Sequence, residues 1–128
     1  MLKYGKGGKM LTFNLKKEWF DKIKSGEKTH EYREVKPYWT KRILKCTQEV
    51  ISKRREMCAN LNLINNPEEI DNLNIPIKII FKCGYPKPTE KNKILHAEMI
   101  SIEEINGKHT DLAINKNVYD IEFKLVRK

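Results

Sequence analysis

The chain has 128 residues, which suits one domain with a buried core rather than two, and its formal net charge of +9 points to a polyanionic partner. No stretch approaches the length of an apolar membrane span, and no apolar leader follows the N-terminal lysines, so a soluble cytoplasmic protein is predicted. The three cysteines form no CxxC pair and the three histidines are scattered, which argues against a disulfide framework and a zinc site. No cofactor and no metal are therefore expected.

The positive charge is unevenly distributed along the chain. Residues 1–43 carry 12 Lys and Arg against 5 Asp and Glu, a balance of +7, whereas residues 44–75 carry −1 and residues 76–128 carry +3. The excess lies around the charged segment described below, which favours an anionic ligand there. Lys, Asn and Ile are also abundant, as an AT-rich coding sequence would produce, and this second explanation of the charge stays open.

The first half begins with a strand and a helix. Residues 10–15 alternate between apolar and polar side chains, which predicts a strand. Residues 16–25 predict a helix, with acidic residues in its first half and basic residues in its second half. Gly26 is expected to end this helix in the left-handed backbone conformation. A charged strand is expected at 28–34. The aromatic residues expected in the core are Phe13, Trp19, Phe20 and Phe81.

A helical region is predicted next. Pro37 begins a short helical turn, and apolar residues recur at helical spacing from 39 to 61. Residues 44–75 are interpreted as a helical insertion within a single domain that spans 1–128.

The second half is rich in strands. They are predicted at 77–82, 93–105 and 118–126, and the second of them turns at Asn106-Gly107, a strong hairpin dipeptide. The terminal strands are expected to share one sheet, covered by the helix at 16–25. The predicted fold is α+β, with a mixed or antiparallel sheet curled into a barrel and two or three flanking helices.

The segment from Ser25 to Glu34 holds most of the candidate chemistry. It contains Lys, His, Glu, Tyr and Arg but no aliphatic residue, and charges are rarely buried unpaired. The strand is therefore either a sheet edge facing water or a set of groups that converge on a ligand. Residues 36–42 follow with two aromatic residues among cations, a mixture that stacks bases and holds phosphates, which favours a ligand.

Strand alternation suggests roles for the charged residues. Glu31 and Arg33 share one face, so they can pair with each other or bracket a ligand. Lys28 points the other way unless it belongs to the preceding turn, and it could anchor a phosphate or act as a general base. The competing interpretation is that Glu31 and Arg33 form an ion pair that seals the barrel. His30 is expected to be exposed rather than catalytic.

The remaining candidates are mostly aromatic. Tyr38 and Trp39 either contact the ligand or plug the core, and both interpretations remain open. Arg42 follows them as a further ligand-binding candidate. Tyr85, after Gly84 in a loop, is a candidate wall for base stacking.

Residues 19–33 resemble the signature of the ASCH domain family, whose core pattern is G-x-K-x-x-E-x-R. All four positions are filled, by Gly26, Lys28, Glu31 and Arg33. The continuation at 37–42 is similar to small ASCH proteins of phages and Gram-positive bacteria. The resemblance implies a PUA-like β-barrel with a cleft beside the motif that binds RNA or modified nucleosides.

One bacterial branch that resembles this chain is an amidohydrolase acting on N4-acetylcytidine, with a Lys, a Thr three positions later and a distant Glu. Lys28 matches the Lys, but Glu31 occupies the Thr position and the distant Glu has no counterpart. The sequence shows no nucleophile–base pair and no metal cluster, so the preferred hypothesis is a module that binds RNA or a nucleotide-like ligand. The alternative is a small hydrolase, either an amidohydrolase on a modified nucleoside or a ribonuclease, using Lys28 and Glu31. A protein-interaction adaptor is a third, weaker interpretation.

Overall fold

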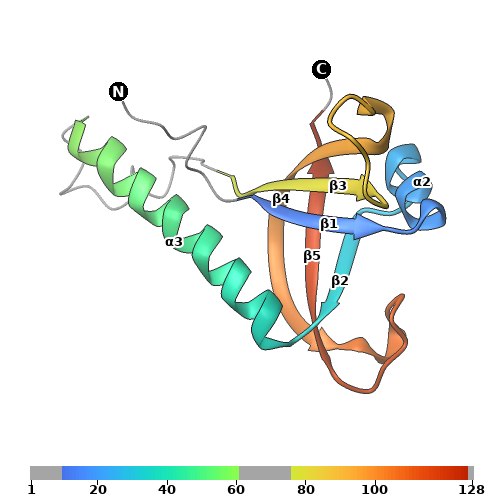
Figure 1. Cartoon of the computed structure of the whole chain (residues 1–128). Helices are drawn as coiled ribbons and strands as arrows, with labels where there is room; N and C mark the ends of the chain where they lie inside the picture. Colours follow the sequence, from blue (N-terminus) through green and yellow to red (C-terminus); the bar gives the residue numbers. More distant parts are fainter. Residues whose placement is uncertain (1–9, 61–75, 127–128) are drawn as a thin grey trace.

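The computed structural model describes residues 10–60 and 76–126, whose strands form one five-stranded mixed sheet (Figure 1). The order across the sheet is β1-β3-β4-β5-β2; β1 and β3 run parallel, and the other neighbouring strands run antiparallel. The sheet curls into a half-barrel, which confirms the α+β class and the mixed sheet. The strands are β1 (Leu11–Leu15), β2 (His30–Glu34), β3 (Lys78–Cys83), β4 (Ile94–Asn106) and β5 (Asn117–Leu125).

The helix α2 (Lys17–Ser25) ends as the sequence predicts. Gly26 has φ of 88°, and its N–H donates to the Ile23 carbonyl oxygen at 3.0 Å. Phe20 and Ile23 are buried, but Trp19 is only partly buried against the core. Trp19, predicted as a core residue, therefore packs at the edge of the core and also lines a cavity.

The helix α3 (Pro37–Asn60) is one continuous helix, so the predicted separation into a short turn and a longer helix is wrong. The Thr40 N–H donates to the Lys36 carbonyl oxygen at 2.9 Å, which starts the helical bonding at the proline. The helix begins beside the sheet and then projects beyond it (Figure 1). Of the predicted insertion, residues 61–75 lie outside the described residues. Neither α2 nor α3 is long and apolar enough to span a bilayer.

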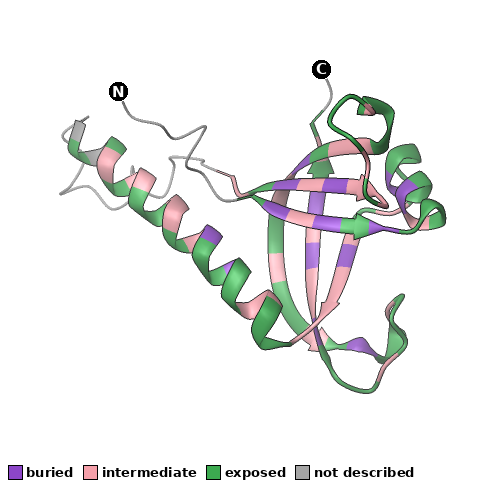
Figure 2. Ribbon diagram, in the orientation of Figure 1, coloured by how far each residue is buried: buried purple, intermediate pink, exposed green. Residues whose placement is uncertain are grey.

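The core lies on the inner face of the half-barrel, where buried side chains alternate along the strands (Figure 2). Phe81 is stacked against Phe13 at 5.7 Å and tilted against Phe123 at 4.7 Å between ring centroids. These three rings come from β1, β3 and β5, and the terminal strands β1 and β5 belong to one sheet, as predicted. Ile43 and Cys46 of α3 complete the contact with β1.

The connection between β4 and β5 begins directly after Asn106. The two strands pair as far as Asn106 and Asn117, leaving residues 107–116 as a loop. Gly107 is buried, and a Cβ there would lie 2.7 Å from Cγ1 of Val118. The chain therefore turns at Asn106-Gly107 as predicted, but Gly107 serves close packing and its φ angle is not positive.

Candidate functional site

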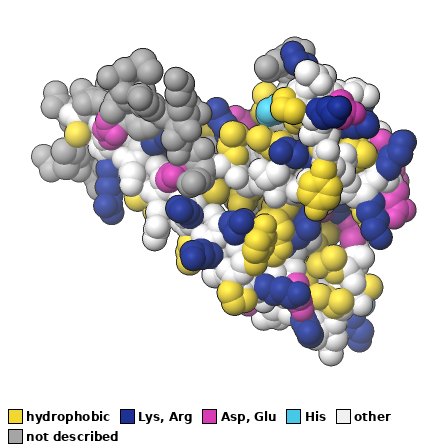
Figure 3. Space-filling model, viewed as in Figure 1, with side chains coloured by type: hydrophobic (Ala, Val, Ile, Leu, Met, Phe, Trp, Pro, Cys, Tyr) yellow, Lys and Arg dark blue, Asp and Glu magenta, His cyan; other side chains and the backbone are white. Residues whose placement is uncertain are grey.

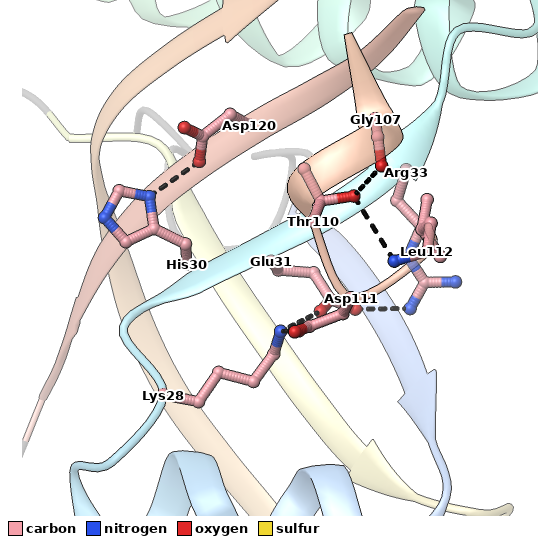
Figure 4. A network of polar contacts seen from close by, with 9 residues as sticks. All are labelled: Lys28, His30, Glu31, Arg33, Gly107, Thr110, Asp111, Leu112 and Asp120. Atoms are coloured by element: carbon pink, nitrogen blue, oxygen red, sulfur yellow. Dashed lines mark hydrogen bonds and ion pairs between the residues drawn. The ribbon is translucent and has the colours of Figure 1, made fainter. Parts of the chain in front are cut away.

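Lys28, Glu31 and Arg33 converge, as Figure 4 shows. Glu31 is 5% exposed and is the one buried polar or charged side chain among the described residues. Arg33 Nη2 donates to Glu31 Oε2 at 2.7 Å, and Lys28 Nζ lies 3.5 Å from Glu31 Oε1. Lys28 belongs to the turn before β2, and its N–H donates to the Lys22 carbonyl oxygen at 3.0 Å. The turn position lets Lys28 reach the same carboxylate as Arg33.

Asp111 is the fourth member of this network, and the sequence carries no signal for it. It lies in the 107–116 loop and forms an ion pair with Lys28, although the two residues are far apart in sequence. The loop is shaped locally by Thr110, whose hydroxyl donates to the Gly107 carbonyl oxygen at 2.8 Å. The network holds two cations and two carboxylates. It therefore carries no excess positive charge.

Aromatic rings surround the two cations. The Lys28 ammonium lies 5.3 Å from the Trp19 ring centroid and 5.1 Å from that of Tyr32. The Arg33 guanidinium lies 4.9 Å from the Phe13 ring and 5.0 Å from the Trp39 ring. These cation–π contacts help the ion pairs to hold both side chains in place. The Nε atom of Arg33 is buried with no hydrogen-bond partner among the described residues.

Tyr32 and His30 lie next to Glu31 in the strand. Burial raises the pKa of Tyr32, and the nearby carboxylates of Asp120 and Asp111 raise it further. His30 is half-buried rather than fully exposed, with its Nδ1 atom 2.6 Å from Asp120 Oδ1. The pair of His30 and Asp120 lies apart from the Glu31 carboxylate in Figure 4.

A cavity of about 200 Å³, here called the motif cavity, opens beside this network. Its lining includes Trp19, Lys28, Glu31, Tyr32, Arg33 and Asp111. A second hollow of about 280 Å³ shares Trp19, Lys28, Tyr32 and Asp111 with it. The Lys28–Asp111 ion pair therefore contributes to the walls of both hollows.

Other predicted site residues line a separate hollow of about 410 Å³, here called the basic groove. It lies between the start of α3 and β1, and its lining includes Thr12, Asn14, Tyr38, Lys41, Arg42 and Lys45. The Arg42 guanidinium lies 3.7 Å from the Tyr38 ring centroid. In Figure 3, Lys and Arg side chains follow the course of α3 beside hydrophobic side chains. The structure thus divides the predicted residues between two hollows.

Trp39 and Tyr85 belong to neither the basic groove nor the motif cavity. Trp39 is partly buried and packs against Phe13 with ring centroids 5.0 Å apart, so it contributes to the core. Tyr85 is 92% exposed in the loop after β3. Its role as a stacking wall remains a prediction.

The buried carboxylate of Glu31 is the distinctive chemical group of this site. Among residues 10–60 and 76–126, no three His, Cys, Asp or Glu side chains gather in a way that could hold a metal ion. A buried carboxylate fixed between two cations and bordered by rings can accept hydrogen bonds from a flat, polar ligand.

Comparisons with family models, curated proteins and solved structures found no match to this chain. The resemblance to ASCH domains therefore rests on the motif residues, and the PUA-like fold remains a prediction.

Proposed function

We propose that this protein binds RNA or a nucleotide-like ligand, with one nucleobase in the motif cavity, and that its half-barrel is a PUA-like fold of the ASCH type. The observation that carries the proposal is the buried Glu31 carboxylate in the cavity wall, held by Lys28 and Arg33. A fixed carboxylate accepts hydrogen bonds from the amino group of a base, as acidic side chains do for cytosine.

The surroundings of Glu31 support a base as the ligand. Trp19 and Tyr32 provide aromatic surface in the cavity wall, and bases stack on such surfaces. A cavity of about 200 Å³ suits a single group rather than a duplex. The base would therefore come from a single strand, a loop or a free nucleotide.

Two observations weigh against the alternative that the Glu31–Arg33 ion pair serves only to stabilise the barrel, here called a structural clasp. A buried ion pair contributes little net stability, because desolvation of both charges offsets their attraction. The clasp also leaves the buried Nε atom of Arg33 without a partner among the described residues, which is costly for a group that serves stability alone.

The hydrolase alternative is less well supported. The Lys28 ammonium is engaged by both Glu31 and Asp111, so it serves as an ion-pair partner rather than as a free nucleophile or base. We therefore assign Lys28 and Glu31 to binding.

The proposal is tested by Glu31→Gln and Arg33→Ala, with melting temperature and affinity measured on each. The ligands are the four ribonucleoside 5′-monophosphates and labelled single-stranded RNA. Glu31→Gln should change which base is preferred, because an acceptor edge becomes a mixed donor and acceptor. Arg33→Ala should weaken binding of every ligand, because it removes both a donor and the partner that fixes Glu31.

Glu34→Gln is the matched control. Glu34 lies on the same strand and pairs with Lys36 and Lys116, but it does not line the motif cavity. This variant should keep the base preference of the wild type. If Glu31→Gln and Arg33→Ala lower the melting temperature but leave affinity per folded molecule unchanged, the motif is a structural clasp and the proposed function is wrong.

A further inference from the structure

The basic groove carries a row of like charges on one helix face. Tyr38, Lys41, Arg42 and Lys45 recur at three- and four-residue spacing, so they lie on the same side of α3. The lining also includes Thr12 and Asn14 of β1 but no Asp or Glu. The groove therefore presents hydrogen-bonding groups and positive charge, without a carboxylate in its walls.

The cations of the groove differ from those of the motif in their partners. Within the described ranges, Lys41 and Lys45 form no ion pair with a carboxylate, and Arg42 packs on Tyr38. Lys28 and Arg33, by contrast, are both paired with carboxylates. The groove therefore holds positive charge that no carboxylate pairs with among the described residues, as exposed lysines such as Lys91 and Lys108 also do, whereas the motif network is internally neutral.

Two aromatic rings with a cation at each end lie between the two sites. The Arg33 guanidinium lies 5.0 Å from the Trp39 ring, and the Trp39 ring meets that of Tyr38 edge-on at 5.0 Å. The Arg42 guanidinium in turn packs over the Tyr38 ring. Asn14 lines both hollows. Proteins that hold a single strand place cations on phosphates and rings against bases, and the groove with Tyr38 and the motif cavity with Trp19 and Tyr32 offer both kinds of group.

From these observations we infer that the ligand is a nucleic acid single strand rather than a free nucleotide. Its phosphodiester backbone lies in the basic groove while one of its bases occupies the motif cavity. This inference rests on the proposed function and adds the polymeric nature of the ligand and the place of its phosphates. A duplex is disfavoured because a stacked and paired base cannot enter the cavity.

The test compares a nucleotide with an oligomer on the wild type and on the double variant Lys41→Gln, Lys45→Gln. The probes are a ribonucleoside 5′-monophosphate and a labelled RNA of about 10 nucleotides, a length within the site sizes of single-strand binding folds. DNA of the same sequence and the RNA duplex are measured alongside. A charge-matched control is Lys91→Gln, Lys108→Gln, since both lysines are exposed and line none of the three hollows.

The wild type should bind the oligomer more tightly than the monophosphate. The groove variant should lose about tenfold in oligomer affinity, the loss expected for two charge-assisted contacts, with its monophosphate affinity and melting temperature unchanged. The control should bind the oligomer like the wild type. The affinities for RNA and for DNA of the same sequence show which of the two backbones the groove prefers, because only RNA carries the 2′-hydroxyl.

Three outcomes would overturn the inference. If the oligomer binds no more tightly than the monophosphate, or if the groove variant keeps full oligomer affinity, the polymer assignment is wrong while the proposed function stands. Tighter binding of the duplex would also exclude a single strand. Absence of binding to every nucleotide and oligomer would overturn both the inference and the proposed function.

Discussion

At the scale of single residues, Asp111 limits how the Lys28 of the motif can contact a ligand. Its carboxylate contacts the ammonium group that would otherwise be available to a phosphate. Its side chain is 36% exposed, whereas that of Lys28 is 9% exposed, so the loop supplies the accessible partner of a largely buried cation. An anionic ligand that reaches Lys28 must compete with Asp111.

This competition predicts that Asp111→Asn strengthens binding of a nucleoside 5′-monophosphate but not of the uncharged nucleoside. The cost in stability should be below about 1 kcal/mol, because partly exposed ion pairs contribute little. Calorimetric titration of both ligands measures the difference. Asp120→Asn is the control, since Asp120 pairs with His30 and lines none of the hollows. Equal affinities for the monophosphate in wild type and Asp111→Asn would mean that Asp111 does not restrict Lys28.

The sequence predicts part of this site and misses the rest for a physical reason. Alternation along a strand is a local property, so the order of residues is enough to place Glu31 and Arg33 on one face. The pairing of Lys28 with Asp111 depends instead on where the 107–116 loop lies, which tertiary packing determines. For the same reason, the local mixture of rings and cations at 36–42 does not reveal that Trp39 packs in the core while Tyr38 lines a groove.

At the scale of elements, periodicity predicts β1, β3 and β5 well because each of them has several buried residues on one face. The elements that differ from their sequence-based prediction are those in which a local sequence signal competes with tertiary packing. Asn106-Gly107 is a strong hairpin dipeptide, yet Gly107 is buried against Val118 and the loop continues to residue 116. Pro37 indicates a helix start, and the helix that begins there runs without interruption through Trp39.

Gly107→Ala tests the packing at this loop. The added Cβ would lie 2.7 Å from Cγ1 of Val118 and 3.0 Å from the carbonyl oxygen of Ile114, so the loop or β5 must shift. We expect a loss of about 1–3 kcal/mol in the free energy of unfolding, the usual cost of overpacking. Denaturant unfolding measures it.

Lys108→Ala provides the comparison, because the neighbouring side chain is exposed and should cost less than about 0.5 kcal/mol. A Gly107→Ala variant as stable as Lys108→Ala would show that the loop does not depend on the absence of a side chain at 107.

At the scale of the whole molecule, charge and its location separate two explanations of the basic composition. A formal charge of +9 alone says little, because an AT-rich coding sequence also raises the number of lysines. The structure distinguishes cations that are already paired, such as Lys28, from those in the basic groove. The groove cations are the ones expected to displace counterions from nucleic acid.

Affinity for single-stranded RNA should therefore fall with salt. Each phosphate neutralised contributes about −0.7 to the slope of log K against log salt, so three groove cations predict a slope of about −2. Fluorescence anisotropy over a series of salt concentrations gives the slope, and an uncharged nucleoside provides the reference with little salt dependence. A flat response for RNA would leave coding bias as the better explanation of the charge.

The strand order also determines when the site can exist during synthesis. β1 pairs with β3 and β2 pairs with β5, so both N-terminal strands find their partners in the second half of the chain. The β3, β4 and β5 strands pair with sequence neighbours, and such local contacts form fastest. The motif residues leave the ribosome early but stay without their sheet until β5 has followed. A nascent chain that has not yet extended through β5 therefore carries the motif sequence without the site that the motif forms.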